Sequence, residues 1–549
     1  MRFKSFFLGA LLLLTTSELF GALAQNVEFF EDKPRSFAKD FYIFTYLQRP
    51  ETTPEEAKEL FFMVHNMNMR FFHLFAKKMD NEAYKKISRC IDLDINTLLK
   101  EDDECLNIGI NLSKVTSLPK NQLSILEPRL SKSYGQLRNV IKLMQNKNVY
   151  DSALKADNET LMMLLQGSIA SYKKQIFPNA LPKEKLDVLS SASRFNTFAI
   201  NTIQNNDMVA FQKALIGLKP SSKVSSKALF FLGLNALKYK NQKQALYFLS
   251  LSEEQATKRD EKDKALFWKY LISKDAASLQ KLSQSSDINM YSLYAIEKLK
   301  LPFSKHIVSP VLEGTHPTFT VSDPFIWPKV MSRVYRMNRD EVESLANEYK
   351  YANTLAHYSY LMERATGYQK HYYPIPFPEE LENNTIHRKA LVLAIARQES
   401  RFLPTVVSTA YALGVMQFMP FLAKDIAKKE KIEEFDLDMM FDPKISYQFG
   451  NIHLDFLEKS LYHPLFVAYA YNGGIGFTKK HLQGGAFGVG KYEPFLSMEM
   501  MINEESREYG KKVLANYVVY RHLLNDDVSI NNLFETLLKP SETDRFRNQ

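Results

Sequence analysis

Hydrophobic residues recur about every three to four positions along most of the chain, and the two-residue alternation that marks strands is almost absent. This spacing is typical of amphipathic helices. Between about residue 54 and residue 305, helix-length apolar stripes alternate with short polar breaks. We therefore predict a mainly α protein whose N-terminal part stacks antiparallel helix pairs as a solenoid.

One helix start is well marked. Thr53 is a suitable N-cap, Pro54 takes the first helical position and Glu56 completes a capping box. Residues 25–50, which precede it, lack a clear period and are expected to form an irregular, aromatic-rich strap. The stripe that follows predicts one helix that buries Leu60, Val64, Met67, Phe71 and Leu74.

Further along, Gly233 followed twelve residues later by Ala245 is similar to a tetratricopeptide pair, although no strict period runs through the segment. A break rich in Ser, Thr and Pro lies at 302–328. It precedes a compact helical segment at about 329–369. One face of that segment is expected to carry Leu345, Tyr349, Ala352 and Leu355.

After a proline-rich extended crossing at 372–378, the sequence predicts a helix at 388–402, a run without Gly or Pro. Pro404 should end it. Glu399 near its end shares the apolar stripe, so burial should raise the pKa of this carboxyl, as a general acid requires. The alternative is a structural Glu paired to Arg401 or to a cation from another segment. The stripe comprises Leu391, Ile395, Glu399 and Phe402.

A chain of 549 residues is too long for one core, and about two to four domains are expected. The net charge of +9 suits an anionic partner, but a mildly basic surface can also serve solubility alone. No nucleic-acid motif accompanies the charge, so we predict no nucleic-acid partner.

The first residues have the features of a targeting segment. Arg2 and Lys4 precede an apolar run at 6–14, and a small-residue cleavage site lies at 22–24. We predict that residues 1–24 are a signal peptide. The mature protein should then be exported, soluble and periplasmic, without an integral membrane segment.

The chain has two cysteines, Cys90 and Cys105. A disulfide between them is plausible in an oxidising compartment, and two buried free thiols are the alternative. Neither cysteine has a histidine nearby at metal-ligand spacing, and we predict neither a metal nor a cofactor.

Three separated motifs carry a family resemblance: Glu399-Ser400, the run Ser408-Thr409-Ala410-Tyr411-Ala412-Leu413-Gly414-Val415-Met416-Gln417-Phe418-Met419-Pro420, and Ala470-Tyr471-Asn472-Gly473-Gly474. In this order they resemble the catalytic domain of the soluble lytic transglycosylases, over about residues 380–525. Small departures are Tyr411, where the family usually has Gly, Val415 for Leu, and Gly473 for Ala.

The resemblance implies that Glu399 is the single acid/base of a peptidoglycan lytic transglycosylase. Such enzymes cleave the MurNAc-β-1,4-GlcNAc bond and leave 1,6-anhydro-MurNAc ends, a reaction of cell-wall turnover. The substrate and partner would be peptidoglycan glycan strands. The nearby acids Asp425, Asp436, Asp438 and Asp442 lie in no motif that demands a catalytic role, and we expect surface or cap positions for them.

The resemblance also implies a set of substrate-binding residues. For the two methionines, core packing is the alternative. For Glu499, which lies six residues before a stretch similar to the family's Glu-Thr-Arg-x-Tyr, the alternative is a charge on a helix surface. The set is Ser408, Gly414, Met416, Gln417, Met419, Tyr471, Asn472 and Glu499.

By the same resemblance, an α-helical superhelix that forms a ring should span 25–305, a linker domain 306–371 and a lysozyme-like catalytic domain 372–540. A polar tail at 541–549 should be frayed. Because all motif residues follow residue 390, we expect the superhelix to be structural. Two other functions stay open: a hydrolase similar to goose-type lysozyme, and a non-catalytic helical scaffold that binds peptidoglycan.

Overall fold

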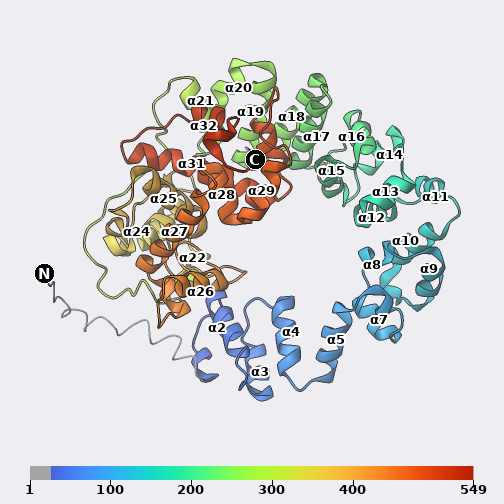
Figure 1. Cartoon of the computed structure of the whole chain (residues 1–549), viewed down its shortest axis with the longest axis horizontal. Coiled ribbons are helices and arrows are strands. Elements are labelled where there is room, and N and C mark those ends of the chain that lie inside the picture. Colours follow the sequence, from blue (N-terminus) through green and yellow to red (C-terminus); the bar gives the residue numbers. More distant parts are fainter. Residues whose placement is uncertain (1–25, 548–549) are drawn as a thin grey trace. The chain divides into compact units, whose positions relative to one another are not determined.

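The protein is described by a computed structural model for residues 26–547. The prediction of a mainly α protein is confirmed, since nearly all regular structure in this range is helical (Figure 1). The chain divides into two compact units. We call residues 81–285 the solenoid unit, and residues 26–80 together with 286–547 the split unit. The predicted signal peptide, 1–24, lies outside the described residues, and the predicted domain boundaries stay predictions.

The solenoid unit is built from helices that pack on their neighbours in the chain, such as α17 on α18 and α18 on α19. In the predicted tetratricopeptide-like pair, Gly233 lies so close to Leu249 that a Cβ would crowd it. The helices are α5 (Glu82–Asp92), α6 (Ile95–Leu98), α7 (Asp103–Gly109), α8 (Leu112–Thr116), α9 (Lys120–Leu126), η2 (Glu127–Arg129), η3 (Lys132–Tyr134), α10 (Gly135–Gln145), α11 (Val149–Lys155), α12 (Asn158–Gly167), α13 (Ala170–Ile176), α14 (Lys183–Leu189), α15 (Phe195–Gln204), α16 (Val209–Ile216), α17 (Ser226–Lys238), α18 (Gln242–Gln255), α19 (Arg259–Ser273) and α20 (Ala276–Ser283).

A disulfide joins Cys90 of α5 to Cys105 of α7, with the two Cα atoms 5.3 Å apart. Of the two states left open by the sequence, the structure therefore has the disulfide rather than free thiols. The bond closes a short loop within the solenoid unit and ties α5 to α7.

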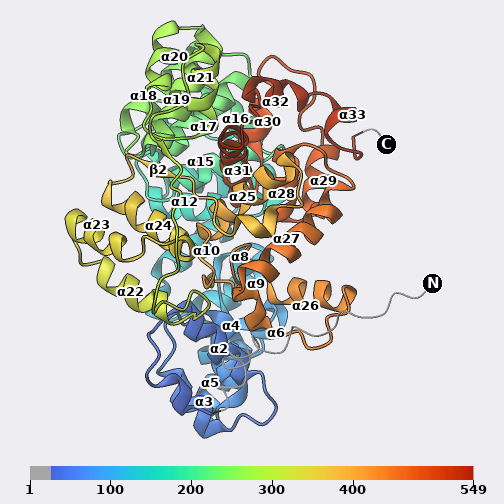
Figure 2. The same cartoon turned by 90° about the vertical axis from the view of Figure 1, so that its left-hand side faces the viewer.

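The split unit has its core where α25 and α28 pack against the long helix α31 (Figures 1 and 2). Its elements are η1 (Glu28–Phe30), α2 (Phe37–Leu47), α3 (Pro54–Phe61), α4 (Met69–Lys78), α21 (Met290–Lys298), β1 (Ile307–Val308), α22 (Ile326–Val334), α23 (Arg339–Glu348), η4 (Ala352–Thr354), α24 (Leu355–Ala365), β2 (His371–Tyr372), η5 (Pro378–Leu381), α25 (Ile386–Ser400), α26 (Pro420–Lys429), η6 (Leu437–Phe441), α27 (Pro443–Glu458), α28 (Pro464–Gly473), α29 (Ile475–Gln483), α30 (Phe495–Met500), α31 (Glu504–Leu523), α32 (Ile530–Thr536) and α33 (Pro540–Thr543).

The capping box at Thr53 is confirmed, but the single long helix predicted after it is wrong. α3 ends at Phe61 and α4 begins at Met69, with Met67 40% exposed in between. The backbone N–H groups of His65 and Asn66 donate to the Asp40 carboxylate over 2.7 and 2.9 Å. These bonds hold the connection in a non-helical conformation that no local pattern specifies.

Three further expectations need correction. The stretch 25–50 is not irregular throughout, because it contains α2, whose Ser36 N-cap bonds to the backbone of Lys39. The predicted face in the segment 329–369 fails at Ala352, which is exposed in the turn between α23 and α24. The tail is not frayed as far as residue 547, since Asp544 is buried and paired with Arg547 over 2.8 Å.

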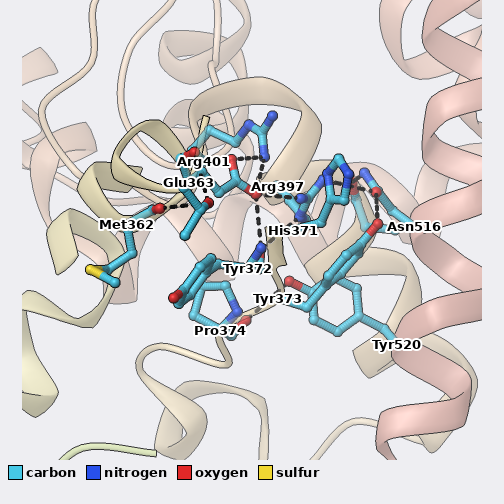
Figure 3. A network of polar contacts seen from close by, with 12 residues as sticks. Met362, Glu363, His371, Tyr372, Tyr373, Pro374, Arg397, Arg401, Asn516 and Tyr520 are labelled. Atoms are coloured by element: carbon cyan, nitrogen blue, oxygen red, sulfur yellow. Dashed lines mark hydrogen bonds and ion pairs between the residues drawn. The ribbon is translucent and has the colours of Figure 1, made fainter. Parts of the chain in front are cut away.

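The proline-rich crossing into the last part of the chain includes a short strand. β2 pairs in parallel with β1, so that Tyr372 lies opposite Val308. The strand places the backbone of Tyr372 and Tyr373 beside the end of α25 (Figure 3). None of the helices between residues 26 and 547 is both long enough and apolar enough to cross a membrane.

Candidate functional site

α25 presents Glu399 in its last turn. The helix starts two residues earlier than predicted, where the Thr385 side chain accepts from the backbone N–H of Arg388, and it ends at Ser400. Arg401 and Phe402 then take left-handed backbone conformations, with φ of 55° and 65°. The predicted single apolar stripe was too narrow, because every residue from 390 to 397 is buried.

The environment of Glu399 suits a general acid. The pKa of its carboxyl is raised from 4.5 to about 7, mainly by burial; a hydrogen bond from Tyr509 opposes the rise and the charge of Glu505 adds to it. That bond runs from the Tyr509 hydroxyl to Oε1 of Glu399 over 2.7 Å. The predicted desolvation is therefore confirmed, and the carboxyl group holds its proton close to neutral pH.

The alternative in which Glu399 pairs with Arg401 is excluded, because the partner of Arg401 is Glu363 of α24 (Figure 3). The buried Glu363 carboxylate binds Arg401 over 2.7 Å and Arg397 over 2.8 Å, and it accepts from the backbone N–H of Tyr372 over 2.9 Å. These contacts fix the end of α25 to α24 and β2.

The loop that follows α25 is held by its own polar side chains. Ser408 Oγ accepts from the backbone N–H of Ala412 over 2.9 Å. The Gln417 amide nitrogen donates to the carbonyl oxygens of Val406 and Gly414 over 2.9 and 2.8 Å. Both N–H bonds of this amide are thus used within the loop, and its carbonyl oxygen is the group left to face a ligand.

Two features of the structure require glycine at position 414: its backbone conformation and the space beside it. Its φ is +77°, and a Cβ at this position would overlap the carbonyl oxygen of Met440 in η6. Met416, two residues on, is fully buried and packs on Gly450 of α27, as core packing requires. Met419 is half-buried at the start of α26.

Tyr471 and Asn472 lie at the end of α28. The Tyr471 hydroxyl donates to the carbonyl oxygen of Met416 over 2.8 Å. Burial and the charge of Glu399 together hold the pKa of Tyr471 well above its ordinary value, which places this ring close to the acid. Asn472 donates to Glu505 over 3.2 Å, the same carboxylate that influences Glu399.

Glu499 is not a charge on a helix surface, since only 1% of its surface is exposed. Its carboxylate forms an ion pair of 2.9 Å with Lys511 of α31 and accepts from the Tyr291 hydroxyl of α21. These contacts join α30 to α31 and α21.

The other acids considered from the sequence occupy structural positions, as expected. Asp425 pairs with Lys429 one turn along α26. Asp436 and Asp442 cap η6 and α27. Asp438 is the exception to a surface or cap position, because it is buried and accepts from Tyr42 of α2.

Tyr509, Glu505 and Glu363 are the contacts that sequence reasoning missed. Tyr509 and Glu505 belong to the stretch similar to Glu-Thr-Arg-x-Tyr, so the motif was a usable signal for both. Glu363 lies outside every motif, and no sequence signal marks it. Among residues 26–547 there is no cluster of side chains suited to hold a metal ion.

Together, the end of α25, the loop that follows it, and Tyr471 and Tyr509 surround one carboxyl group whose pKa is raised, which is the arrangement of a general-acid enzyme. Residues 377–487 match the family described as "Transglycosylase SLT domain". The matched stretch contains Glu399, Ser408, Gln417 and Tyr471, and it ends before Tyr509.

Curated relatives match the same part of the chain. The soluble lytic murein transglycosylase of Salmonella typhimurium is 30% identical over 159 residues, which are 29% of this chain and 23% of that protein. The Escherichia coli K12 protein of the same name is 30% identical over 149 residues, 27% of this chain and 23% of its own length. The match thus spans about a quarter of each relative's length.

A solved structure resembles much more of the chain. The lytic transglycosylase Slt of Pseudomonas aeruginosa, in an inactive mutant form, has a TM-score of 0.53 at 16% identity. The alignment covers 93% of this chain and 92% of that one. At this identity the likeness shows the fold, and it agrees with the mainly α architecture.

Proposed function

We propose that the protein is a lytic transglycosylase that cleaves the MurNAc-β-1,4-GlcNAc bond of peptidoglycan and forms 1,6-anhydro-MurNAc ends. The observation that carries the proposal is the half-buried Glu399 carboxyl at the end of α25, whose pKa, raised to about 7, lets one group donate a proton and later take one up. The family of the domain and the names of its curated relatives support the choice of substrate.

In the proposed reaction, protonated Glu399 first gives its proton to the leaving glycosidic oxygen. The resulting carboxylate then takes the proton of the C6 hydroxyl of the same MurNAc, and that oxygen closes a ring on C1. An internal nucleophile needs no second carboxylate and no water. The effective molarity of such a nucleophile offsets roughly 7–11 kcal/mol of barrier in the best cases.

The surrounding residues have proposed roles that follow from their contacts. Tyr509 holds Glu399 in place by its hydrogen bond and stabilises the carboxylate once the proton has left. Tyr471 lines the site beside the acid. Gln417 presents a carbonyl oxygen to the hydroxyl and amide N–H groups of the glycan, because its N–H bonds are taken by the loop.

The remaining residues of the predicted set have less direct proposed roles. Ser408 and Gly414 shape the substrate-binding loop, and Asn472 orients Glu505. Met416 supports the loop from the core, while Met419 forms an apolar wall. For Glu499, we keep the family-based assignment to the groove as a proposal, with its ion pair to Lys511 as the support of α30.

The proposed substrate also fits the predicted location. Peptidoglycan lies outside the cytoplasmic membrane, so export to the periplasm is part of the proposal. The predicted signal peptide supports it. The net charge of +9 is favourable for a polymer whose stem peptides carry carboxylates.

Digestion of purified peptidoglycan followed by mass spectrometry of the muropeptides tests the proposal. A lytic transglycosylase releases products one water lighter than hydrolysed ones. Products that all carry free reducing ends would instead indicate a hydrolase of the goose-type lysozyme kind. Binding to peptidoglycan without any soluble product would indicate a non-catalytic scaffold.

A further inference from the structure

Tyr411 is unusual for both its conformation and its surroundings. It lies in the loop between Ser408 and Gln417, at a position where the family pattern has Gly, and its φ is +69°. A left-handed backbone is unfavourable for a residue with an aromatic side chain. The ring is nevertheless buried, with 3% of the residue exposed. Packing of the ring must therefore compensate for the backbone strain.

The ring packs against two helices from the start of the chain, which we call the N-terminal brace: α2 and α4, drawn in blue in Figure 1. Its centroid lies 5.2 Å from that of Phe44 and 6.1 Å from those of Phe41 and Phe71. The guanidinium group of Arg70 covers the ring at 5.5 Å. The brace and the loop both belong to the split unit.

The brace also contacts η6, a second element that packs against the same loop. The Tyr42 hydroxyl of α2 donates to Asp438 of η6 over 2.6 Å. Two residues further along η6 is Met440, whose carbonyl oxygen lies against Gly414. The Asp40 carboxylate, which binds the connection before α4, makes α2 and α4 one packed element.

We propose that the N-terminal brace positions the loop 408–417 for glycan binding, and that Tyr411 is the positioning residue through which it acts. This inference rests on the proposed function, in which the loop contacts the glycan. The partner of the acid, Tyr509, comes from α31 and not from the brace. The brace should therefore govern how well substrate binds, and leave the acid–base step unchanged.

Tyr411→Gly tests this in the full-length protein, because glycine accepts the left-handed backbone and removes only the ring. Tyr411→Phe keeps the ring. Tyr368→Gly is a matched control, since Tyr368 also has a positive φ, of 58°, but is 54% exposed after α24. Hydrogen exchange of the amides of Leu413, Gly414 and Phe418, which bond within the loop, reports the order of the loop without any activity.

In Tyr411→Gly we expect these amides to exchange at least about tenfold faster. KM for soluble glycan strands should rise several-fold, while kcat and the pH profile stay near those of the wild type. Tyr368→Gly should match the wild type in every measurement, and Tyr411→Phe, which keeps the ring, should restore most of what Tyr411→Gly loses. Unchanged exchange in Tyr411→Gly would refute the brace, and faster exchange with unchanged KM would refute its role in binding.

Two further outcomes are distinguishable. If the wild type does not turn over peptidoglycan, the proposed function fails, while the exchange data still decide whether the brace orders the loop. If Tyr411→Gly does not fold, Phe44→Leu in α2 is the second variant, because it removes the ring that packs on Tyr411. Phe44→Leu should speed amide exchange in the loop and raise KM, each by less than Tyr411→Gly. Wild-type values of both the exchange rates and KM would refute the proposal.

Discussion

Glu399→Gln should stabilise the protein at pH 8 but bring no gain in stability near pH 4. The folded protein raises the pKa of this carboxyl from 4.5 to about 7. Below pH 4.5 the group is protonated whether the chain is folded or not, so it adds no pH dependence. Between 4.5 and 7 the unfolded chain releases the proton first, and stability falls as pH rises. Above 7 the full cost of a buried carboxylate is present.

The size of the cost follows from the same two values. A difference between 4.5 and about 7 corresponds to about 3 kcal/mol at roughly 1.4 kcal/mol for each pKa unit. Gln has nearly the same shape, and its Oε1 can still accept from Tyr509, but its NH₂ group brings two donors that need partners. We therefore expect a net gain of about 1–3 kcal/mol at pH 8.

Urea or thermal unfolding of the wild type and Glu399→Gln between pH 4 and pH 8 measures this difference. Glu433→Gln is a matched control, since it removes the same charge from an exposed position and should change stability little at any pH. A stability difference for Glu399→Gln that does not grow with pH would refute the claim that burial holds the proton on Glu399.

The same variant should lose turnover, because an amide neither donates a proton to the glycosidic oxygen nor takes one from the C6 hydroxyl. General acid–base help is typically worth roughly 10²–10⁴-fold, and here one group serves both steps. Glycan binding should persist, which pull-down with insoluble peptidoglycan checks. A folded Glu399→Gln protein with near-normal activity would exclude Glu399 as the acid/base.

Three further predictions concern the contacts around the site and the solenoid unit. Tyr509→Phe removes the bond that lowers the pKa of Glu399, so the alkaline limb of the pH–rate profile should move to higher pH. Glu363→Gln leaves two arginines without their counter-charge; it should lower stability by about 3–5 kcal/mol in urea unfolding and move that limb to lower pH. Replacement of Cys90 and Cys105 by Ser should cost about 2–4 kcal/mol in the unfolding of the solenoid unit, with little effect on the pH profile.

Local patterns predicted the element that carries the acid, and tertiary contacts decided its details. The apolar run before Glu399 predicted a helix and a desolvated carboxyl, and both are present. The pattern did not predict that the helix would be buried all round, because its covering helices, α27 and α31, come from later in the chain. Likewise, Tyr509 belongs to a motif, but its contact with Glu399 joins residues 110 positions apart, which no local pattern predicts.

The start of the chain was the least predictable part for the same reason. Aromatic residues in 25–50 indicated packing, but not its partner. The contact of Phe44 with Tyr411 links positions that share no motif. In the sequence, Tyr411 was only a departure from the Gly of the family pattern. Such a departure does not tell whether the new side chain is merely accommodated or whether its packing offsets the strain of a left-handed backbone. The positive φ and the buried ring show that it is compensated.

The position of Glu363 explains how Glu399 can keep its proton although an arginine lies two residues away on each side of it in the sequence. Arg397 and Arg401 flank Glu399 at two residues on either side, and a free guanidinium that close would stabilise the carboxylate and lower its pKa. Glu363 binds both cations in a buried cluster, and the causes that shift the pKa of Glu399 are burial, Tyr509 and Glu505, with neither arginine among them. The cluster thus fixes the helix end and keeps its positive charge away from the acid. Loss of the Glu363 charge and loss of the Tyr509 hydroxyl should therefore move the pH–rate profile in opposite directions.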